Sequence, residues 1–209
     1  GGETIFLKNG VYNGNYQNGN YATQNDVVGS VSKVLNKVGE SRDGVIINAS
    51  CNSFAFISST ADFTLTNITF KTVPKSLNMA TAGVISVKGA ANANITNCSV
   101  IDSGVNKAFL ISTTGNVLIE NFTMANCALG NSANGIQSDA QGTVTMKNAV
   151  FKDNYFQVYS ANTEKINYLI SITKAAWTME NVVIANNNVL TQNGLIYVTS
   201  RASLNMVDC

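Results

Sequence analysis

The chain repeats one arrangement of apolar and polar positions, and its clearest copy covers residues 144–151, Val-Thr-Met-Lys-Asn-Ala-Val-Phe. Apolar side chains stand four and two residues before the asparagine, and one and three residues after it. Alternation with a period of two is typical of a β-strand that buries one face. Because the alternation restarts at the asparagine, we predict two short strands joined by a one-residue corner.

The asparagine of this pattern recurs along the chain at intervals of 24 to 33 residues. A repeat of this length predicts a stack of similar turns, each of which buries its apolar face against its neighbours. Asparagine suits a corner because it tolerates the left-handed backbone region, and the amides of successive turns can bond to one another as a ladder. The predicted corner ladder consists of Asn67, Asn97, Asn121, Asn148, Asn181 and Asp208.

A further strand is predicted in each turn, because two mostly apolar residues stand 12 and 10 positions before each corner. In one turn the two residues stand one position closer to the corner. Three strands per turn predict about seven turns, with nearly all length variation after the third strand. The insertions then lie on one face, where repeat proteins usually carry binding surfaces. The pairs are Ala55 and Ile57, Ile85 and Val87, Phe109 and Ile111, Ile136 and Ser138, Ile170 and Ile172, and Ile196 and Val198.

Two stretches near the N-terminus, residues 2–12 and 38–47, are similar to the first coils of right-handed parallel β-helices of the pectin-lyase-like superfamily. Residues 151–154, Phe-Lys-Asp-Asn, resemble the first half of the repeat of polymorphic outer membrane proteins. The Gly-Gly-Ala-Ile half of that repeat is degenerate here, with one glycine at most. The resemblance implies an all-β parallel solenoid over nearly the whole chain.

Length and composition fit one elongated domain, since 209 residues with 45% hydrophobic content can bury a sizeable core. We expect a single β-helix domain over residues 1–209, with its first coils in residues 1–43 and regular repeats in residues 44–209. Because the sequence lacks an initial Met and stops inside a repeat, we expect a fragment of a longer chain. It contains no apolar run near the roughly 18 residues of a membrane span, so we expect no membrane insertion within it.

The charge and the metal-binding side chains argue against several functions. A net charge of +1 and a charged fraction of 12% give no basis for binding nucleic acid. Because histidine and Cys-x-x-Cys pairs are absent from the sequence, we expect neither a metal site nor a cofactor. We predict that Cys51, Cys98, Cys127 and Cys209 are buried free thiols, since Cys98 and Cys209 point inward too many turns apart for a disulfide.

Two outward columns of the predicted stack carry charge. Glu120, Lys147 and Glu180 precede their corners by one residue and are expected to pair across adjacent turns. The column five residues after the corner includes Asp102 and Asp153, which suggests either a calcium site or a second polar ladder. We favour the ladder, because two turns separate these carboxylates by about 10 Å, too far to share one ion.

The longest insertion, residues 152–167, is the candidate interaction surface. Exposed aromatic side chains on a polar loop can stack on sugar rings or anchor a protein partner. The alternative is that they fold back over the coil as a satellite cluster. The candidate residues are Tyr155, Phe156, Tyr159 and Tyr168.

Five glycosylation sequons occur, about as many as chance predicts for so many asparagines. The candidate glycosylation sites are Asn48 and Asn94. The other three sequons start at corner residues that we predict to be buried.

Catalysis is not expected from the sequence. Superfamily members that cleave acidic polysaccharides use carboxylates about 5–10 Å apart or acidic calcium ligands beside a base. Here the carboxylates scatter over different faces, and none of the superfamily's catalytic motifs is matched. We therefore expect a structural or adhesive segment of an extracellular or cell-surface protein, which binds protein or carbohydrate surfaces or stacks into filaments. The alternative is a polysaccharide lyase or hydrolase whose site is completed outside this segment.

Overall fold

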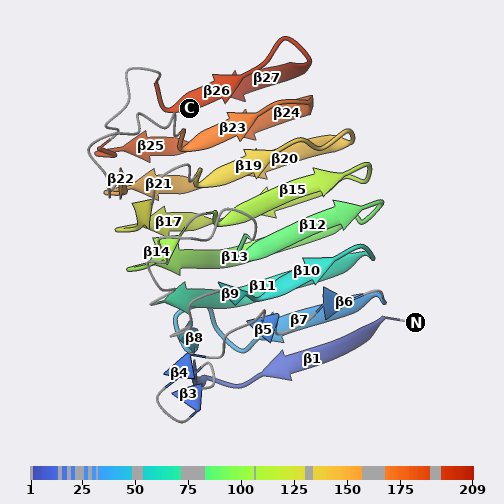
Figure 1. The fold of residues 1–209 in the computed structure, drawn as a ribbon, viewed down its shortest axis with the longest axis vertical. Helices are drawn as coiled ribbons and strands as arrows, with labels where there is room; N and C mark the ends of the chain where they lie inside the picture. Colours follow the sequence, from blue (N-terminus) through green and yellow to red (C-terminus); the bar gives the residue numbers. More distant parts are fainter. Residues whose placement is uncertain are drawn as a thin grey trace.

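The computed structural model of the chain is a parallel β-solenoid, whose successive turns stack along the long axis of the molecule (Figure 1). It describes residues 2–13, 16–17, 20–21, 26–27, 30–31, 33–48, 54–71, 83–105, 107–129, 134–156, 168–188 and 194–209. Regular structure in these ranges consists of β-strands. Within them, no helix is long and apolar enough to cross a membrane.

The largest sheet has 13 strands and forms two rows that meet at the corner residues. The pre-corner row consists of β1 (Glu3–Leu7), β7 (Leu35–Gly39), β11 (Phe63–Lys71), β13 (Ala93–Ile101), β16 (Val117–Glu120), β20 (Thr143–Lys147), β24 (Ala175–Glu180) and β27 (Ala202–Val207). Strands β11 and β13 continue through the corner into the second row. The other members of this post-corner row are β2 (Gly10–Asn13), β8 (Val45–Asn48), β17 (Thr123–Ala125), β21 (Val150–Lys152) and β25 (Val183–Ala185).

The strand predicted ahead of each corner forms a second sheet of seven strands. It contains β6 (Ser30–Val31), β10 (Ile57–Ser59), β12 (Ile85–Gly89), β15 (Phe109–Thr113), β19 (Ile136–Ser138), β23 (Ile170–Ile172) and β26 (Ile196–Val198). One predicted register is wrong, because Ile57 pairs with Ile85 and Ser59 pairs with Val87. The turn after β10 is therefore shorter than predicted, and the Ser59 hydroxyl closes it by donating to the Ala61 carbonyl at 2.6 Å.

A short strand in some turns was not predicted. It lies seven residues after the corner, where β14 (Gly104–Val105), β18 (Ala128–Leu129) and β22 (Tyr155–Phe156) form a sheet of three strands. Near the N-terminus, β3 (Tyr16–Gln17) and β4 (Asn20–Tyr21) form an antiparallel hairpin. The remaining strands, β5 (Asp26–Val27) and β9 (Phe54–Ala55), pair in parallel.

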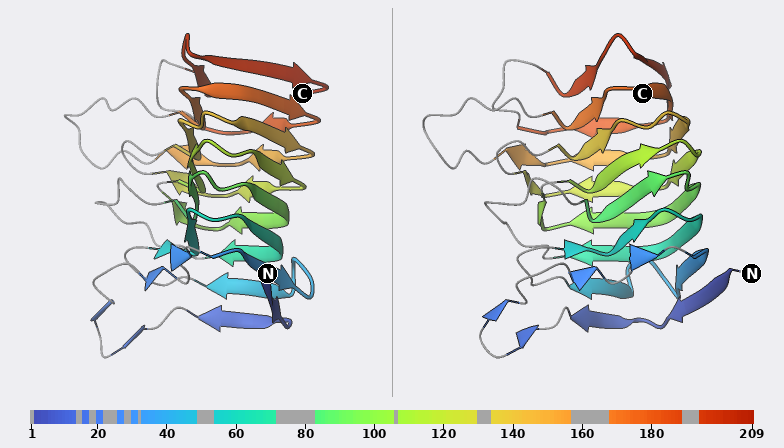
Figure 2. Two further views of the ribbon diagram at one scale, coloured as in Figure 1. Left: turned by 90° about the vertical axis from the view of Figure 1, so that its right-hand side faces the viewer. Right: turned by 45° about the vertical axis from the view of Figure 1, so that its right-hand side comes forward.

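The solenoid has about five regular turns rather than the seven predicted. Each regular turn has an asparagine corner and described strands in both rows and in the second sheet. The turns outside them are less complete: the described residues place no second-sheet strand before β1 and no post-corner strand after β27. Figure 2 shows the regular turns stacked between these two ends.

The core is the interior of the stack, because alternate side chains of every row point inward. One inward column passes through Leu65, Ile95 and Ile119, which are all fully buried. Aromatic rings fill the neighbouring space, and Phe109 packs edge-on against Phe122 with centroids 4.7 Å apart. Burial of each such large side chain stabilises the fold by about 1.5–3 kcal/mol.

Candidate functional site

The predicted corner residues form one column, and all six have left-handed backbone conformations with φ between 52° and 59°. The amide of Asn97 donates to Oδ1 of Asn67 at 2.7 Å, and that of Asn181 donates to Oδ1 of Asn148 at 2.8 Å. At the start of the column, Asn67 donates to the carbonyl of Gly39 at 3.0 Å. Each of these bonds runs from a later turn to an earlier one.

A second corner lies five residues after the first and is also left-handed, at Asp102, Asn126, Asp153 and Asn186. Nδ2 of Asn126 donates to Oδ1 of Asp102 at 2.8 Å, so the column begins a polar ladder as predicted. Lys71 lies 3.2 Å from the other oxygen of Asp102. The hydrogen bond from Asn126, helped by Lys71, lowers the pKa of Asp102 below its usual value.

An inner ladder next to the second corner was missed by the sequence analysis. Asn154 is 1% exposed, and its amide donates to the Met124 carbonyl at 3.1 Å and to Oδ1 of Asn187 at 2.9 Å. Its own Oδ1 accepts from the backbone amide of Cys127 at 3.0 Å. Asn187 repeats the arrangement by donating to the Phe151 carbonyl at 2.9 Å. These bonds satisfy backbone groups that the second corner would otherwise leave buried and unpaired.

A further polar column lies on the short connection between each second-sheet strand and the pre-corner strand that follows it. Oδ1 of Asp62 accepts from the backbone amide of Asn92 at 2.8 Å. The Asn92 side chain accepts in the same way from Asn116 at 2.9 Å, and the Asn116 side chain accepts from Thr143 at 3.1 Å. Hydrogen bonds thus join successive coils at three places on the perimeter: the first corner, the second corner and the connection before the pre-corner row.

The predicted interaction loop is only partly an exposed surface. Phe156 is 5% exposed and belongs to the core, so its prediction as an exposed anchor is wrong. The reason is that residues 155–156 continue as β22, which pairs with β18 and turns Phe156 inward. Tyr155 is half-buried, and Tyr159 lies outside the described residues. Tyr168 stacks on Tyr197 of the next turn, with centroids 4.6 Å apart.

The two candidate glycosylation sites differ in environment. Asn94 is exposed on the outer face of β13, between Thr64 and Leu118 of the adjacent strands. Asn48 is half-buried and donates its amide to Oδ1 of Asn13 at 2.7 Å. Glycosylation of either residue stays a prediction.

In the charged column before the corner, the predicted pairing is confirmed for Lys147 and Glu180, which lie 2.8 Å apart. Their hydrogen bond raises the pKa of Lys147. Within the described ranges, no three Asp, Glu or Cys side chains lie close enough together to hold a metal ion.

Two lysines are almost fully buried and were not singled out from the sequence. Lys37 stands in the inward column of Leu65, and its ammonium lies 4.2 Å from the centre of the Phe56 ring. Burial lowers the pKa of Lys37 to about 8. Lys107 is also 4% exposed, and burial lowers its pKa. Alternation gave no signal for either lysine, because the apolar Val38 follows Lys37 and the buried Ala108 follows Lys107.

The cysteines follow the prediction in part. Cys98 and Cys127 are buried free thiols, and burial raises the pKa of each to about 12. Cys209 is exposed, which corrects the prediction of its burial. It holds an inward position, but no described strand lies over the last turn to cover it. Cys51 lies outside the described residues.

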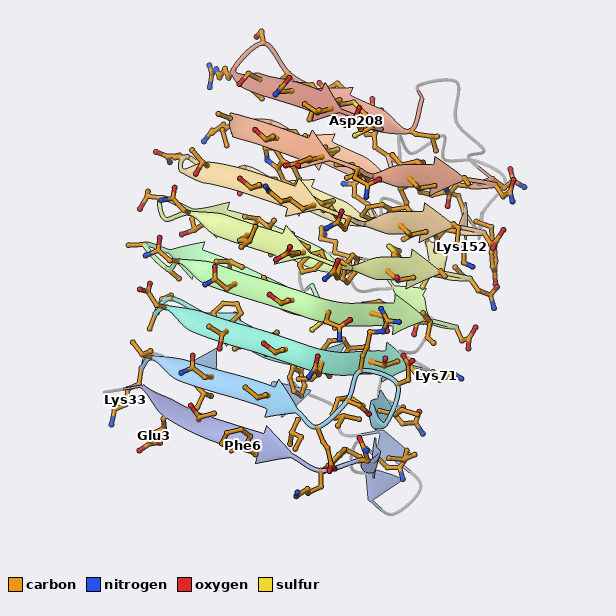
Figure 3. All side chains as sticks on the ribbon, turned by 180° about the vertical axis from the view of Figure 1, so that it is seen from behind. Glu3, Phe6, Lys33, Lys71, Lys152 and Asp208 are labelled. Carbon is orange, nitrogen blue, oxygen red and sulfur yellow. The ribbon has the colours of Figure 1, made fainter. Side chains whose placement is uncertain are left out.

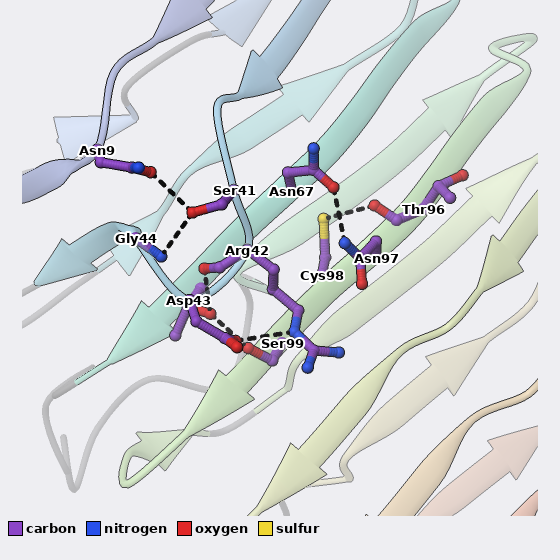
Figure 4. A network of polar contacts seen from close by, with 11 residues as sticks. Asn9, Ser41, Arg42, Asp43, Gly44, Asn67, Thr96, Asn97, Cys98 and Ser99 are labelled. Atoms are coloured by element: carbon purple, nitrogen blue, oxygen red, sulfur yellow. Dashed lines mark hydrogen bonds and ion pairs between the residues drawn. The ribbon is translucent and has the colours of Figure 1, made fainter.

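In the turn before the regular repeats, the corner between β7 and β8 spans several residues instead of one asparagine, and a polar network closes it (Figure 4). The Ser41 hydroxyl donates to Oδ1 of Asn9 at 2.8 Å and accepts from the Gly44 amide at 3.1 Å. The carbonyl of Arg42 accepts from Thr69 of the next turn at 2.9 Å. The network therefore fixes the first strands to the regular stack.

Comparison of the chain with protein-family models, with curated proteins and with solved structures gave no significant match.

Proposed function

We propose that this chain is a non-catalytic structural or adhesive segment of an extracellular or cell-surface protein, in which it acts as a stiff spacer. The observation that supports the proposal most strongly is the set of side-chain hydrogen bonds that join neighbouring turns in four polar columns. Parallel strand pairing between the turns, reinforced by these hydrogen bonds, suits a rod that resists local opening and proteolysis.

The use of the carboxylates also favours a structural role. In the described part of the chain, five of them bond to other residues; four of these bonds join successive turns, while that of Asp43 goes to its sequence neighbour Arg42. These pairs are Glu40 with Asn9, Asp43 with Arg42, Asp62 with Asn92, Asp102 with Lys71, and Glu180 with Lys147. A polysaccharide lyase or hydrolase would instead need carboxylates gathered around a substrate.

The resemblance of residues 2–12, 38–47 and 151–154 underlies our further proposal that the chain belongs to the pectin-lyase-like superfamily, near the polymorphic outer membrane proteins. The structural role that we propose includes the association of copies of the chain into filaments.

The test is incubation of the purified chain with polygalacturonate and other acidic polysaccharides, with calcium present and absent. We expect neither reducing ends nor unsaturated products above the rate without protein. Polysaccharide-cleaving activity that stays with the chain through purification would overturn the non-catalytic assignment. Location is tested separately by labelling intact source cells with an antibody, and labelling only after lysis would overturn the surface assignment.

A further inference from the structure

The side-chain amides divide the five sequons of the sequence into two groups. In the first group the amide already joins neighbouring turns. Asn48 donates to Oδ1 of Asn13 at 2.7 Å. Asn67 donates to the Gly39 carbonyl at 3.0 Å, and Asn97 donates to Oδ1 of Asn67 at 2.7 Å. A sugar on Nδ2 replaces an amide hydrogen and adds a bulky group beside the neighbouring turn, so glycosylation in this group opposes the stacking of the turns.

The second group consists of Asn94 and Asn121, which are both exposed. The exposure of Asn121 corrects the prediction that the corner sequons start at buried residues. In the part of the chain that the structure describes, neither side chain has a hydrogen-bond partner, and the bonds of the corner ladder do not include Asn121. Both amides can therefore carry a sugar without the loss of a bond between turns.

The hydroxyl two residues after the asparagine, which completes a sequon, follows the same division. In the first group, Thr69 and Ser99 are 4% exposed, and their hydroxyls share a hydrogen bond of 2.7 Å. In the second group, Thr96 and Thr123 are half-buried, and their hydroxyls have no partner among the described residues. Strand alternation places Thr96 on the same outer face as Asn94. The amide and the hydroxyl of a sequon are thus accessible together in the second group.

The two exposed asparagines lie on one side of the solenoid. Asn94 lies in β13 and Asn121 directly follows β16, and these strands are neighbours in the pre-corner row. Figure 3 shows the outer face of this row, from Phe6 at one end to Asp208 at the other. The connections at both edges of the row are short, whereas the insertions follow the post-corner row in the sequence. Sugars at these positions therefore cover a face that the insertions do not adjoin.

We propose that Asn94 and Asn121 are N-glycosylation sites whose sugars coat the outer face of the pre-corner row. The donor is an oligosaccharide linked through phosphate to a lipid. Nδ2 forms a bond to the anomeric carbon and loses one proton, while the bond from that carbon to the phosphate oxygen breaks and its electron pair leaves with the lipid phosphate. Partners then contact the side that carries the insertions. The inference rests on the proposed extracellular location, because exported chains receive this modification.

The test is production of the full chain with an export signal and a flexible tail that carries a control sequon, in a eukaryotic host that glycosylates secreted proteins. The protease-resistant, folded fraction is digested, and mass spectrometry measures the sugar at each sequon. We expect sugars at Asn94, Asn121 and the tail, and unmodified asparagine at positions 48, 67 and 97. Asn94→Gln should remove one glycan from the intact mass. Thr123→Val should do the same, because it destroys the other sequon and keeps its corner residue.

Ser99→Ala is the matched control, because it destroys the sequon of Asn97 and should leave the glycan mass unchanged. An unmodified Asn94 beside a modified tail would overturn the proposal, and so would sugar on Asn97 in the folded fraction. The tail reports export and sugar transfer by itself, so neither outcome depends on where the natural protein resides. Failure here is therefore distinct from failure of the proposed location, which the labelling of source cells tests.

Discussion

The side-chain amide of Asn97 donates a 2.7 Å hydrogen bond to Oδ1 of Asn67, while both residues hold left-handed backbone. Two contributions therefore meet at one residue: tolerance of positive φ and a bond between turns. Asn97→Ala removes both and should lower the free energy of unfolding by about 2–3 kcal/mol. Asn97→Gly removes only the bond and should lower it by about 1 kcal/mol.

The matched control for these variants is Asn94→Ala, because Asn94 is an exposed asparagine of the same strand. Urea unfolding should show a change within about 0.5 kcal/mol for it. Equal losses for the alanine and glycine variants at position 97 would contradict the assigned role of the left-handed corner.

The inner ladder predicts a larger effect at Asn154. Asn154→Leu leaves the Cys127 amide and the Met124 carbonyl buried without their partner. We expect a loss of about 2–4 kcal/mol in the free energy of unfolding. Asn126→Gly on the exposed outer ladder keeps the left-handed conformation and removes only the bond to Asp102, so it should lose less. A reversed order in the two unfolding curves would be inconsistent with this account.

Burial of Lys37 predicts a pH dependence of stability. Its pKa falls from 10.5 to about 8 on folding, so folding releases a proton between these pH values. Where the unfolded chain binds more protons, the free energy of unfolding rises with pH. We expect a rise of about 1–3 kcal/mol from this group between pH 8 and 10.5.

Lys37→Met isolates this contribution, because other groups titrate equally in both proteins. The variant should be the more stable protein at about pH 7, and its advantage should shrink as the pH rises. An advantage that is constant across the range would show that Lys37 does not change protonation on folding.

The cysteines predict graded reactivity. Cys209 should react with a thiol reagent in the folded protein, because it is exposed. Cys98 and Cys127 should react only on unfolding, since they are buried and their pKa values are raised to about 12. The measurement is a reagent titration of a Cys51→Ser variant in buffer and in denaturant. Fast modification of more than one thiol per folded chain would contradict the described packing.

The corner column could be predicted from the sequence because one residue type recurs where the alternation restarts. The register of β10 could not, because alternation specifies only which face a residue occupies. A shift of two residues leaves every side chain on its face, so Ile57 was aligned with Val87 instead of Ile85.

The inner ladder escaped prediction because its column has no common residue type. The equivalent positions are occupied by Ser103, Cys127, Asn154 and Asn187. Each side chain bonds to a backbone carbonyl, the serine through a hydroxyl, the cysteine through a thiol and the asparagines through amides. Phe156 was assigned to an exposed loop because the short β22 has no period long enough to recognise. Both errors concern features that arise only when turns are stacked.

The in-register stacking of the turns is tested most directly by a distance between spin labels at Thr64→Cys and Asn205→Cys. These positions share one outward column and are five strand spacings apart, which is about 24 Å. Cys51 and Cys209 are replaced by serine, and the buried thiols stay unlabelled. Pulsed electron spin resonance should give one narrow distribution near this distance, within the reach of the label arms. A broad distribution, or one centred beyond about 35 Å, would contradict the stacked parallel solenoid.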